Sequence, residues 1–306
     1  MTFIFTKLSK FKKIFFILLI IFIYSIDSWA DESTLDNILR THTLIIGYRT
    51  SSIPFSYLND KQKAIGYSID LCQEVAMAIK NKLGLSKLNL KFVPITSQNR
   101  IVLLQSGTID IDCGSTSNLK SRRRQVDFSN SIFLAHTKMM VKSGSSIQDF
   151  KTVGNKVVVV SSGTSSDNTL AQFARKNNLS FNIIYGKDHA NSFLLLMTGR
   201  ASAFVNDDSI LYGLRARIRG RASKFVVLPE SLKSEPYALM LRKNDPKFKK
   251  VVDDALRNVM ESGNIILLYR KWFMSPVPPN GINVSMPLSE DTKELFNHPN
   301  DVSADG

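Results

Sequence analysis

Short apolar runs alternate along most of the chain with stretches that repeat an apolar position every three or four residues. The short runs predict β-strands at Thr43–Tyr48, Leu88–Ile95, Ile109–Cys113, Lys156–Val160, Phe181–Tyr185, Ala203–Val205 and Tyr237–Leu241. The repeating stretches predict α-helices at 68–83, 98–105, 163–173, 189–197, near Ile210, at Phe248–Met260 and at Ile265–Phe273. We expect Ser68 to cap the first of these helices, and Thr96 or Ser97 to cap the second.

Strands that alternate with helices are typical of parallel α/β sheets. The alternation occurs twice, on either side of about Phe133–Met139, which predicts two α/β lobes. After the last helix, Pro276, Pro278 and Pro279 begin a polar tail that we expect to be loosely ordered.

The N-terminus has the order of a cleavable signal peptide. Four lysines between positions 7 and 13 precede an uncharged apolar run, Ile14–Tyr24, and the sequence Ser28-Trp29-Ala30 follows. The apolar run is too short for a membrane anchor, which needs about 20 residues. We therefore expect export, with cleavage after Ala30.

The chain carries a net charge of +14, of which +11 belongs to the expected mature part. Such a protein could meet anionic lipid, nucleic acid or an anionic small molecule. The arginine clusters at 122–124 and 215–221 lack interleaved aromatic residues, so we expect no nucleic-acid partner. Cys72 and Cys113 lie in a chain bound for an oxidising compartment, but their spacing leaves a disulfide and two free thiols equally open.

Catalytic and metal-binding patterns are missing from the sequence. It has no G-x-S-x-G, H-E-x-x-H or G-x-x-x-x-G-K-[ST] motif, and its four histidines lack neighbours at metal-ligand spacing. Asp207 and Asp208 are adjacent and would point to opposite faces of a strand. We expect no enzyme activity, no metal and no cofactor.

Anion-binding side chains gather where predicted strands end and helices begin. Ligands of α/β sheets bind beyond the carboxyl ends of strands, where helix N-termini offer free N–H groups. Arginine adds a planar fork that matches a carboxylate. The loops in question hold Arg49 with Ser51 and Ser52, Ser97 with Arg100, Ser115 and Ser117 with Arg122, and Thr164 with Ser165. Three arginines at such loops predict a ligand with more than one anionic group.

Five stretches resemble periplasmic glutamate/aspartate-binding proteins, the solute receptors of ABC amino-acid importers (solute-binding protein family 3). They are GYRTSSIPFSY (47–57), PITSQNRIVLLQSGTIDIDCGSTSN (94–118), VVVVSSGTSS (157–166), KDHANSF (187–193) and YALMLRKNDPKFKK (237–250). The resemblance runs in order from about Ser33 to Asn300, and the SQNR and CGST segments are specific to the acidic-amino-acid branch.

The resemblance implies a type II periplasmic binding protein, an α/β fold of two lobes joined by two hinge strands that close over L-glutamate or L-aspartate. Residues 31–134 plus 232–306 would form lobe 1, and residues 135–231 lobe 2. The implied partner is the membrane permease of an ABC importer, and we expect a monomer.

The resemblance also assigns roles to nine residues. Arg122, with Ser115, Ser117 and Ser165, would bind the α-carboxylate of the ligand. Asp207 and the Ser115 carbonyl would take the α-ammonium. The side-chain carboxylate would be surrounded by Arg49, Ser97, Arg100 and His189. The sequence departs from the family at Ser117 and Ser165, where threonine is expected, although both keep the hydroxyl.

Two other functions are compatible with the same scaffold. The family resembles some exported dehydratases and cell-wall lytic proteins, so an exported enzyme is one alternative. An amino-acid sensor that presents its ligand to a membrane receptor is the other. The arginines and hydroxyls at the pocket positions favour binding over catalysis.

Overall fold

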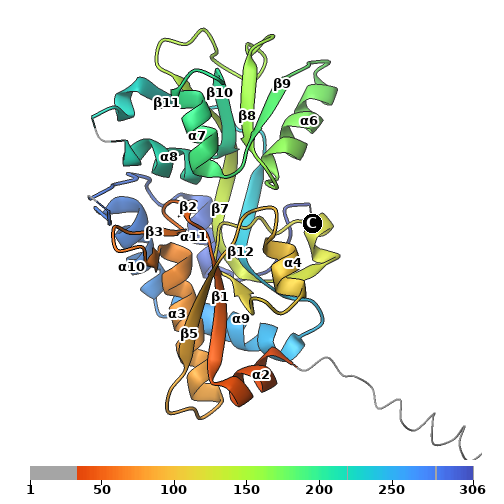
Figure 1. Cartoon of the computed structure of the whole chain (residues 1–306), viewed down its shortest axis with the longest axis vertical. Helices are drawn as coiled ribbons and strands as arrows, with labels where there is room; N and C mark the ends of the chain where they lie inside the picture. Colours follow the sequence, from red (N-terminus) through yellow and green to blue (C-terminus); the bar gives the residue numbers. More distant parts are fainter. Residues whose placement is uncertain (1–32, 219, 280, 306) are drawn as a thin grey trace, which may run out of the picture.

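The computed structural model describes residues 33–218, 220–279 and 281–305. The predicted signal peptide and its cleavage site lie outside these residues. The described chain forms two lobes, one above the other in Figure 1, with two long strands passing between them. This confirms the predicted two-lobed α/β fold.

The lower lobe is built on a sheet with the strand order β5-β1-β6-β12-β7, beside a small sheet of β2, β3 and β4. Its strands are β1 (Thr43–Tyr48), β2 (Ser51–Ser52), β3 (Ser56–Leu58), β4 (Ala64–Ile65), β5 (Asn89–Pro94), β6 (Ile111–Asp112) and β12 (Ser234–Arg242). Its helices are α2 (Thr34–Thr41), α3 (Tyr67–Lys82), α4 (Arg100–Gln105), α5 (Lys120–Arg123), α9 (Pro246–Glu261), α10 (Asn264–Tyr269) with a π-helical turn (Arg270–Met274), and α11 (Glu290–Asn297).

The upper lobe continues the sheet in the order β7-β10-β8-β9, and β11 also pairs with β7. Its strands are β8 (Val157–Ser161), β9 (Asn182–Gly186), β10 (Ala203–Asp207) and β11 (Phe225–Val227). Its helices are α6 (Ser166–Lys176), α7 (His189–Met197), α8 (Asp208–Arg217) and a 3₁₀ turn (Ala222–Lys224). In Figure 1 α6 lies on one side of the sheet, and α7 and α8 lie on the other.

The strand β7 (Val126–Lys142) belongs to both lobes. It pairs with β12 as far as His136 and with β10 from Thr137 onward. Both pairings are antiparallel, whereas β1 with β5 and β6, and β8 with β9 and β10, are parallel as expected. The small sheet of β2, β3 and β4 and the pairing of β11 with β7 are antiparallel as well. These strands depart from the predicted parallel order because they do not belong to successive βαβ units. The lobe boundaries at 134/135 and 231/232 stay a prediction.

One predicted helix cap is wrong. Helix α3 follows Gly66, at φ 139°, and the Ser68 hydroxyl instead donates to the Gly114 carbonyl, 2.8 Å away. The other prediction agrees with the hydrogen bonds at the turn before α4. There the Thr96 hydroxyl accepts from the Asn99 amide at 3.2 Å, and the Thr96 amide donates to the Asn99 side chain at 2.7 Å.

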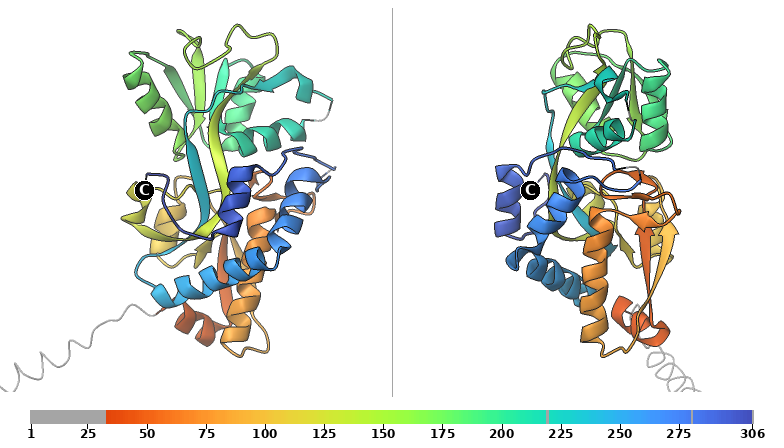
Figure 2. Two further views of the ribbon diagram at one scale, coloured as in Figure 1. Left: turned by 180° about the vertical axis from the view of Figure 1, so that it is seen from behind. Right: turned by 90° about the vertical axis from the view of Figure 1, so that its left-hand side faces the viewer.

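The prediction of a loosely ordered tail is also wrong. The segment after residue 275 returns across the lower lobe, where Val277, Ile282 and Val284 are buried. Helix α11 then packs on β7 through residues that include the buried Phe296. The views in Figure 2 show α11 beside the strands that join the lobes. Widely spaced apolar residues anchor this segment, and such spacing gives no periodic signal in the sequence.

A cluster of aromatic rings lies under the junction of the lobes. Phe133 stacks on Phe273 at 5.1 Å between ring centroids, and Tyr269 stacks on Phe273 at 4.4 Å. Tyr237 of β12 meets Phe55 edge-on at 5.1 Å. Aromatic pairs of this kind add about 0.5–1.5 kcal/mol each to the burial of the rings. The cluster therefore anchors β7 and β12, the two strands that pass between the lobes, in the core of the lower lobe.

Cys72 of α3 and Cys113 after β6 form a disulfide, which settles the alternative that the sequence left open. Both residues are buried, and the bridge closes a separation of 41 residues. It joins α3 to the beginning of the loop that carries Ser115 and Ser117.

Among the described residues, no helix is long and apolar enough to cross a membrane.

The disulfide should contribute measurably to stability. Replacing both cysteines by alanine should lower the free energy of unfolding by about 3–4 kcal/mol, because a bridge over a loop of this length restricts the unfolded chain. Urea unfolding of the variant and of the oxidised wild type measures the difference. The wild type under reductant is the control and should lose a similar amount. A loss below about 1 kcal/mol would show that the noncovalent contacts of the loop are sufficient.

Candidate functional site

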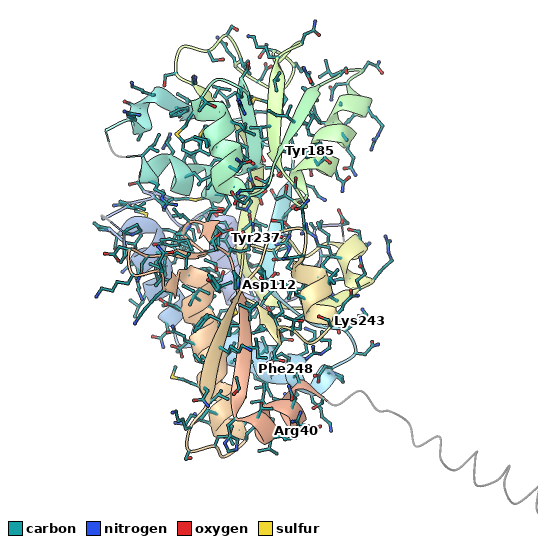
Figure 3. The ribbon with its side chains drawn as sticks, in the orientation of Figure 1. Arg40, Asp112, Tyr185, Tyr237, Lys243 and Phe248 are labelled. Carbon is teal, nitrogen blue, oxygen red and sulfur yellow. A yellow bond between two sulfur atoms is a disulfide. The ribbon has the colours of Figure 1, made fainter. Side chains whose placement is uncertain are left out.

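A small polar cavity lies where the two lobes meet. Tyr237 is at this level in Figure 3, with Asp112 below it and Tyr185 above it in the upper lobe. The lining residues are Arg100, Ser115, Ser117, Arg122, Thr164, Ser165, His189, Asn206, Asp207 and Tyr237. Seven of the nine residues predicted from the sequence are among them, and the other two, Arg49 and Ser97, lie directly behind. The space is about 10 Å³, about what one water occupies.

Arg49 and Arg100 enter the site from the lower lobe, and each exposes only 2% of its surface. Arg100 donates to the Thr116 hydroxyl at 2.6 Å, and that hydroxyl donates to the Asp112 carboxylate at 2.6 Å. Desolvation and the charge of Arg100 lower the pKa of Arg49 to about 10. The buried carboxylate of Asp112 faces both guanidinium groups, and Asp207 acts on Arg100 as well. Desolvation still lowers the pKa of both arginines, so an added negative charge would be favourable here.

Several polar atoms at this end of the site have no partner among the described residues. They are four that can donate, Arg49 Nη1, Arg100 Nε and the hydroxyls of Ser97 and Ser115, and one acceptor, Asp112 Oδ1. Buried polar groups in native proteins are normally hydrogen-bonded, and an unpaired one costs about 1–3 kcal/mol. The four donors lie beside two cations and outnumber the one acceptor, so the group is suited to an anion such as a carboxylate.

His189 begins helix α7 in the upper lobe and is oriented by its neighbours. His189 Nδ1 lies 2.9 Å from the Asn206 side-chain nitrogen and 3.0 Å from the Ser161 hydroxyl, and the Asn206 oxygen accepts from the Asp207 amide. His189 Nε2 lies 3.4 Å from Arg49 Nη2. Burial and the charges of Arg49 and Arg100 hold the His189 pKa well below its usual value. The ring is therefore neutral, and it lies on the same side as the unpaired groups.

Arg122, at the other end of the cavity, is held by main-chain oxygens. It donates to the Ser117 carbonyl at 2.9 Å and to the Gly163 carbonyl of the upper lobe at 3.4 Å. Desolvation and the charge of Arg100 lower the Arg122 pKa to about 9. The Ser117 and Ser165 hydroxyls lie 3.5 Å apart across the two lobes. A cation and two hydroxyls thus converge at a second place in the cavity.

A carboxylate that the sequence did not predict faces this second place. Glu235, on β12, is 1% exposed and accepts a hydrogen bond from the Ser165 hydroxyl at 2.5 Å. Lys233 lies 3.7 Å from its other oxygen. Ser165 was predicted to bind a ligand carboxylate, and in this structure Glu235 occupies that role.

Asp207 ends β10 and connects the lobes through Tyr237. It accepts hydrogen bonds from the Tyr237 hydroxyl and, at 3.4 Å, from the Thr137 hydroxyl. Burial and the negative charge of Glu235 raise the Asp207 pKa to about 7. A cation placed beside Asp207 would favour its ionised form and lower this pKa again.

The residues missed by sequence reasoning share one property. Thr116, Asn206, Glu235 and Tyr237 act through neighbours contributed by other segments of the chain. Glu235 is the second residue of β12 and belongs to no motif in the sequence. The strand pattern does not show which face of β12 the carboxylate occupies.

The structure shows the two lobes closed on each other. Gly163 of the upper lobe, at φ 76°, touches the main chain of the lower lobe so closely that an added Cβ would lie 2.8 Å from atoms of Ser97 and Gln98. Helix α8 also approaches the lower lobe, since a Cβ on Gly213 would lie 2.2 Å from the Ile53 carbonyl oxygen. An amino acid therefore needs the lobes to separate before it can enter the cavity.

Two α/β lobes, two crossing strands and a small polar cavity between the lobes define a two-lobed solute-binding protein. The chain belongs to the bacterial extracellular solute-binding proteins, family 3, whose family model matches residues 44–275.

Two relatives share 43% of their residues with this chain. One is the glutamate/aspartate import solute-binding protein of Escherichia coli, over 272 residues that cover 89% of this chain and 90% of that protein. The other is the L-glutamate/L-aspartate-binding protein of Pseudomonas aeruginosa, over 279 residues that cover 90% and 92%. A crystal structure of an ancestral amino acid-binding protein, a precursor of cyclohexadienyl dehydratase, is 28% identical with a TM-score of 0.66, and the match covers 78% of this chain and 99% of that one.

Gly163 provides a test of closure that leaves the ligand-binding side chains intact. Gly163→Ala should weaken ligand binding about tenfold or more, because the methyl group meets the lower lobe only when the lobes close. Gly144→Ala is the matched control, since Gly144 has φ 77° and open space around its Cβ position. Calorimetry gives the affinity, and small-angle scattering gives the shape with ligand. Equal affinities for the two variants would exclude a role of this contact in closure.

Proposed function

We propose that this protein captures L-glutamate or L-aspartate between its two lobes and delivers it to the membrane permease of an ABC importer. The observation that carries the proposal is the group of unpaired buried donors beside Arg49 and Arg100, opposite a second anion-binding place at Arg122. The relatives named for glutamate and aspartate support it. A ligand with two carboxylates and one ammonium matches this arrangement.

In the proposed complex the α-carboxylate binds Arg122 and the Ser117 hydroxyl, and it replaces Glu235 as the acceptor of the Ser165 hydroxyl. Ser115 lies between the two ends, where its carbonyl and Asp207 accept from the ammonium. The side-chain carboxylate lies among Arg49, Ser97, Arg100 and His189. Hydrogen bonds to charged groups contribute about 1.5–3 kcal/mol each, and micromolar affinity needs about 8 kcal/mol. A few such contacts are therefore sufficient.

Neutral amino acids should be excluded by the same charges. Glutamine would bring no negative charge to Arg49 and Arg100, whose buried counter-charges are Asp112 and, for Arg100, Asp207. Incomplete neutralisation of buried charges costs several kcal/mol. Glutamate supplies the missing negative charge. The preference for acidic ligands thus follows from two guanidinium groups that the protein itself leaves incompletely neutralised.

The location and assembly belong to the same proposal. We infer a periplasmic protein, exported through the N-terminal signal peptide and cleaved after Ala30, that acts as a monomer. Residues 31–134 with 232–306 would rotate against residues 135–231 about the strands β7 and β12. The ligand touches both lobes, so it favours the closed form and stabilises the folded protein.

The enzyme alternative has less support. A carboxylate with a pKa near 7, such as Asp207, is what general acid–base catalysis needs. However, the Tyr237 and Thr137 hydroxyls already engage the two oxygens of Asp207. The relatives with 43% identity are named as binding proteins. Both facts favour a non-enzymatic role.

Calorimetry with a panel of amino acids tests the proposed ligand and the two ends of the site. Arg122→Ala should weaken glutamate and aspartate about a hundredfold, since it removes the charged partner of the shared α-carboxylate. Arg100→Met should weaken the acidic ligands and spare or admit glutamine. Arg124→Ala, at an exposed position two residues from Arg122, is the control and should bind as the wild type does.

Three outcomes would contradict these assignments. If the wild type binds neither acidic amino acid, the proposed ligand is wrong. Near-native affinity in Arg122→Ala would remove that residue from the site. Equal losses for glutamate and glutamine in Arg100→Met would move Arg100 away from the side-chain carboxylate.

Binding should release a proton near neutral pH. The Asp207 pKa is about 7 in the ligand-free closed protein, and the ligand ammonium should lower it. Affinity should therefore be highest above pH 7 and fall as the pH drops below 7, by up to about tenfold per unit. Calorimetry between pH 5.5 and 8, in buffers of different ionisation enthalpy, counts the protons.

Two controls identify the titrating group. Glutarate has both carboxylates but no ammonium, so its binding should not release this proton. His136→Gln removes a half-buried histidine whose pKa is raised by Asp208, and the pH dependence should persist in that variant. A pH dependence that disappears with His136 would assign the proton to the hinge instead.

A further inference from the structure

The last residues of the chain run along the back of the site. We call residues Asn300–Asp305 the C-terminal strap. Its main chain is tied to the lower lobe at two points, because the Ser131 amide donates to the Asn300 carbonyl at 2.8 Å and the Ala304 amide donates to the Asn118 carbonyl at 2.9 Å. Figures 1 and 2 place the C-terminus at the level where the lobes meet.

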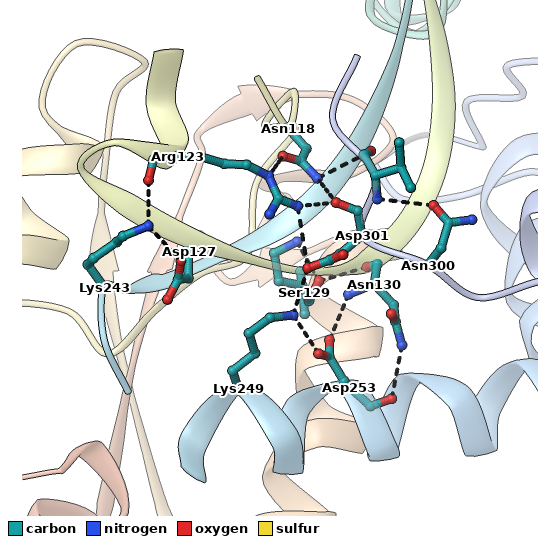
Figure 4. A network of polar contacts seen from close by, with 12 residues as sticks. Asn118, Arg123, Asp127, Ser129, Asn130, Lys243, Lys249, Asp253, Asn300 and Asp301 are labelled. Atoms are coloured by element: carbon teal, nitrogen blue, oxygen red, sulfur yellow. Dashed lines mark hydrogen bonds and ion pairs between the residues drawn. The ribbon is translucent and has the colours of Figure 1, made fainter. Parts of the chain in front are cut away.

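Asn118 is the centre of this attachment. It is fully buried, and its side-chain amide donates to the Asp301 carbonyl at 2.8 Å. Its side-chain oxygen accepts from Arg123 Nε at 2.7 Å, and its backbone amide donates to the Pro236 carbonyl of β12 at 2.8 Å. Figure 4 shows Arg123 and Asn118 meeting the strap from the same side.

Charges hold the strap in place as well. The Asp301 carboxylate lies 3.4 Å from Arg123 and 3.1 Å from Lys249. Lys249 also pairs with Asp253 at 2.6 Å, and Asp253 accepts from the Asn130 amide of β7 at 2.7 Å. At the end of the strap, Asp305 pairs with Lys233 at 2.5 Å, next to Glu235. The strap is therefore bonded to β7, to Lys233 just before β12, and to the loop before α5.

The strap encloses the segment that presents Arg122. Asn118 directly follows Ser117, whose carbonyl accepts from Arg122, and Arg123 directly follows Arg122. Asn118 and Arg123, the residues next to Ser117 and Arg122, are thus both fixed by residues 300–305. Helix α5 has only four residues and no side-chain cap, so it cannot fix Arg122 by itself.

We propose that the C-terminal strap is a positioning element of the α-carboxylate subsite, with Asp301 and Arg123 as its positioning residues. It holds Ser117–Arg123 in the binding geometry before the ligand arrives. This inference rests on the proposed function. A preorganised segment loses little freedom on binding, so the strap raises affinity without touching the ligand.

The test compares the full chain with a chain that ends after His298 and with Asp301→Ala. The shortened chain should bind glutamate and aspartate about tenfold or more weakly, as expected when the supporting contacts of a binding residue are lost. Both ligands should lose the same factor, because the α-carboxylate is common to them. Hydrogen exchange of the amides at 117–124 should accelerate without ligand, while the amides of β8 and β10 keep their protection.

Asp301→Ala and Arg123→Ala form a double-mutant cycle within the full chain, which keeps the test open if the shortened chain does not fold. The double variant should be little weaker than the worse single variant. Asp254→Ala, which breaks an exposed pair with Lys250 at 2.8 Å on the same helix as Lys249, should leave affinity unchanged. Phe296→Leu should lower the melting temperature and leave affinity unchanged, which separates positioning from general stability.

Unchanged exchange at 117–124 in the shortened chain would overturn the proposal. An affinity loss no larger than that of Phe296→Leu at the same folded fraction would also overturn it. If the wild type binds no acidic amino acid, the proposed function fails, while the exchange experiment still decides whether the strap holds this segment.

Discussion

The gathering of three guanidinium groups in one small space, two of them buried and that of Arg122 half-buried, is the constraint on which the site depends. Arg49, Arg100 and Arg122 repel one another, and each has a pKa lowered by desolvation. The protein offers Asp112, Asp207 and Glu235 in return, but Asp207 is itself only partly ionised near pH 7. When the lobes close, the repulsion and desolvation of these arginines are therefore best offset by a solute that carries its own carboxylates.

The connection between the lobes fits this requirement. Charges that are balanced only after capture need a structure that opens and closes without unfolding. Here β7 stays one continuous strand, which exchanges one set of partners for another between His136 and Thr137. Tyr237 extends from the aromatic cluster of the lower lobe to Asp207 of the upper lobe. Because the two lobes are joined by the paired strands β7 and β12, opening and closing can be confined to a few residues of these strands.

Periodicity was sufficient to predict the alternating α/β order, and it placed β1 and α7 at their observed bounds. Their buried apolar residues lie where the pattern predicts, so local pattern and final environment agree. The loops with Arg49, Arg100 and Arg122 were found because several basic residues at strand ends are rare. Glu235, Asn118 and Asp301 could not be found this way, because their partners are 70, 183 and 178 residues distant in the chain. The tail was misjudged because its few buried residues follow no period.

The division of the lower lobe along the chain has a consequence for biogenesis. Its sheet includes β12, and its surface includes α9, α11 and residues 300–305, all of which follow the whole upper lobe in sequence. The upper lobe can therefore fold as soon as its own contiguous segment has emerged, whereas the lower lobe must wait for the end of the chain. A product that ends before β12 would contain a complete upper lobe but an incomplete lower lobe. Such a product could not close over a solute, because closure needs both lobes.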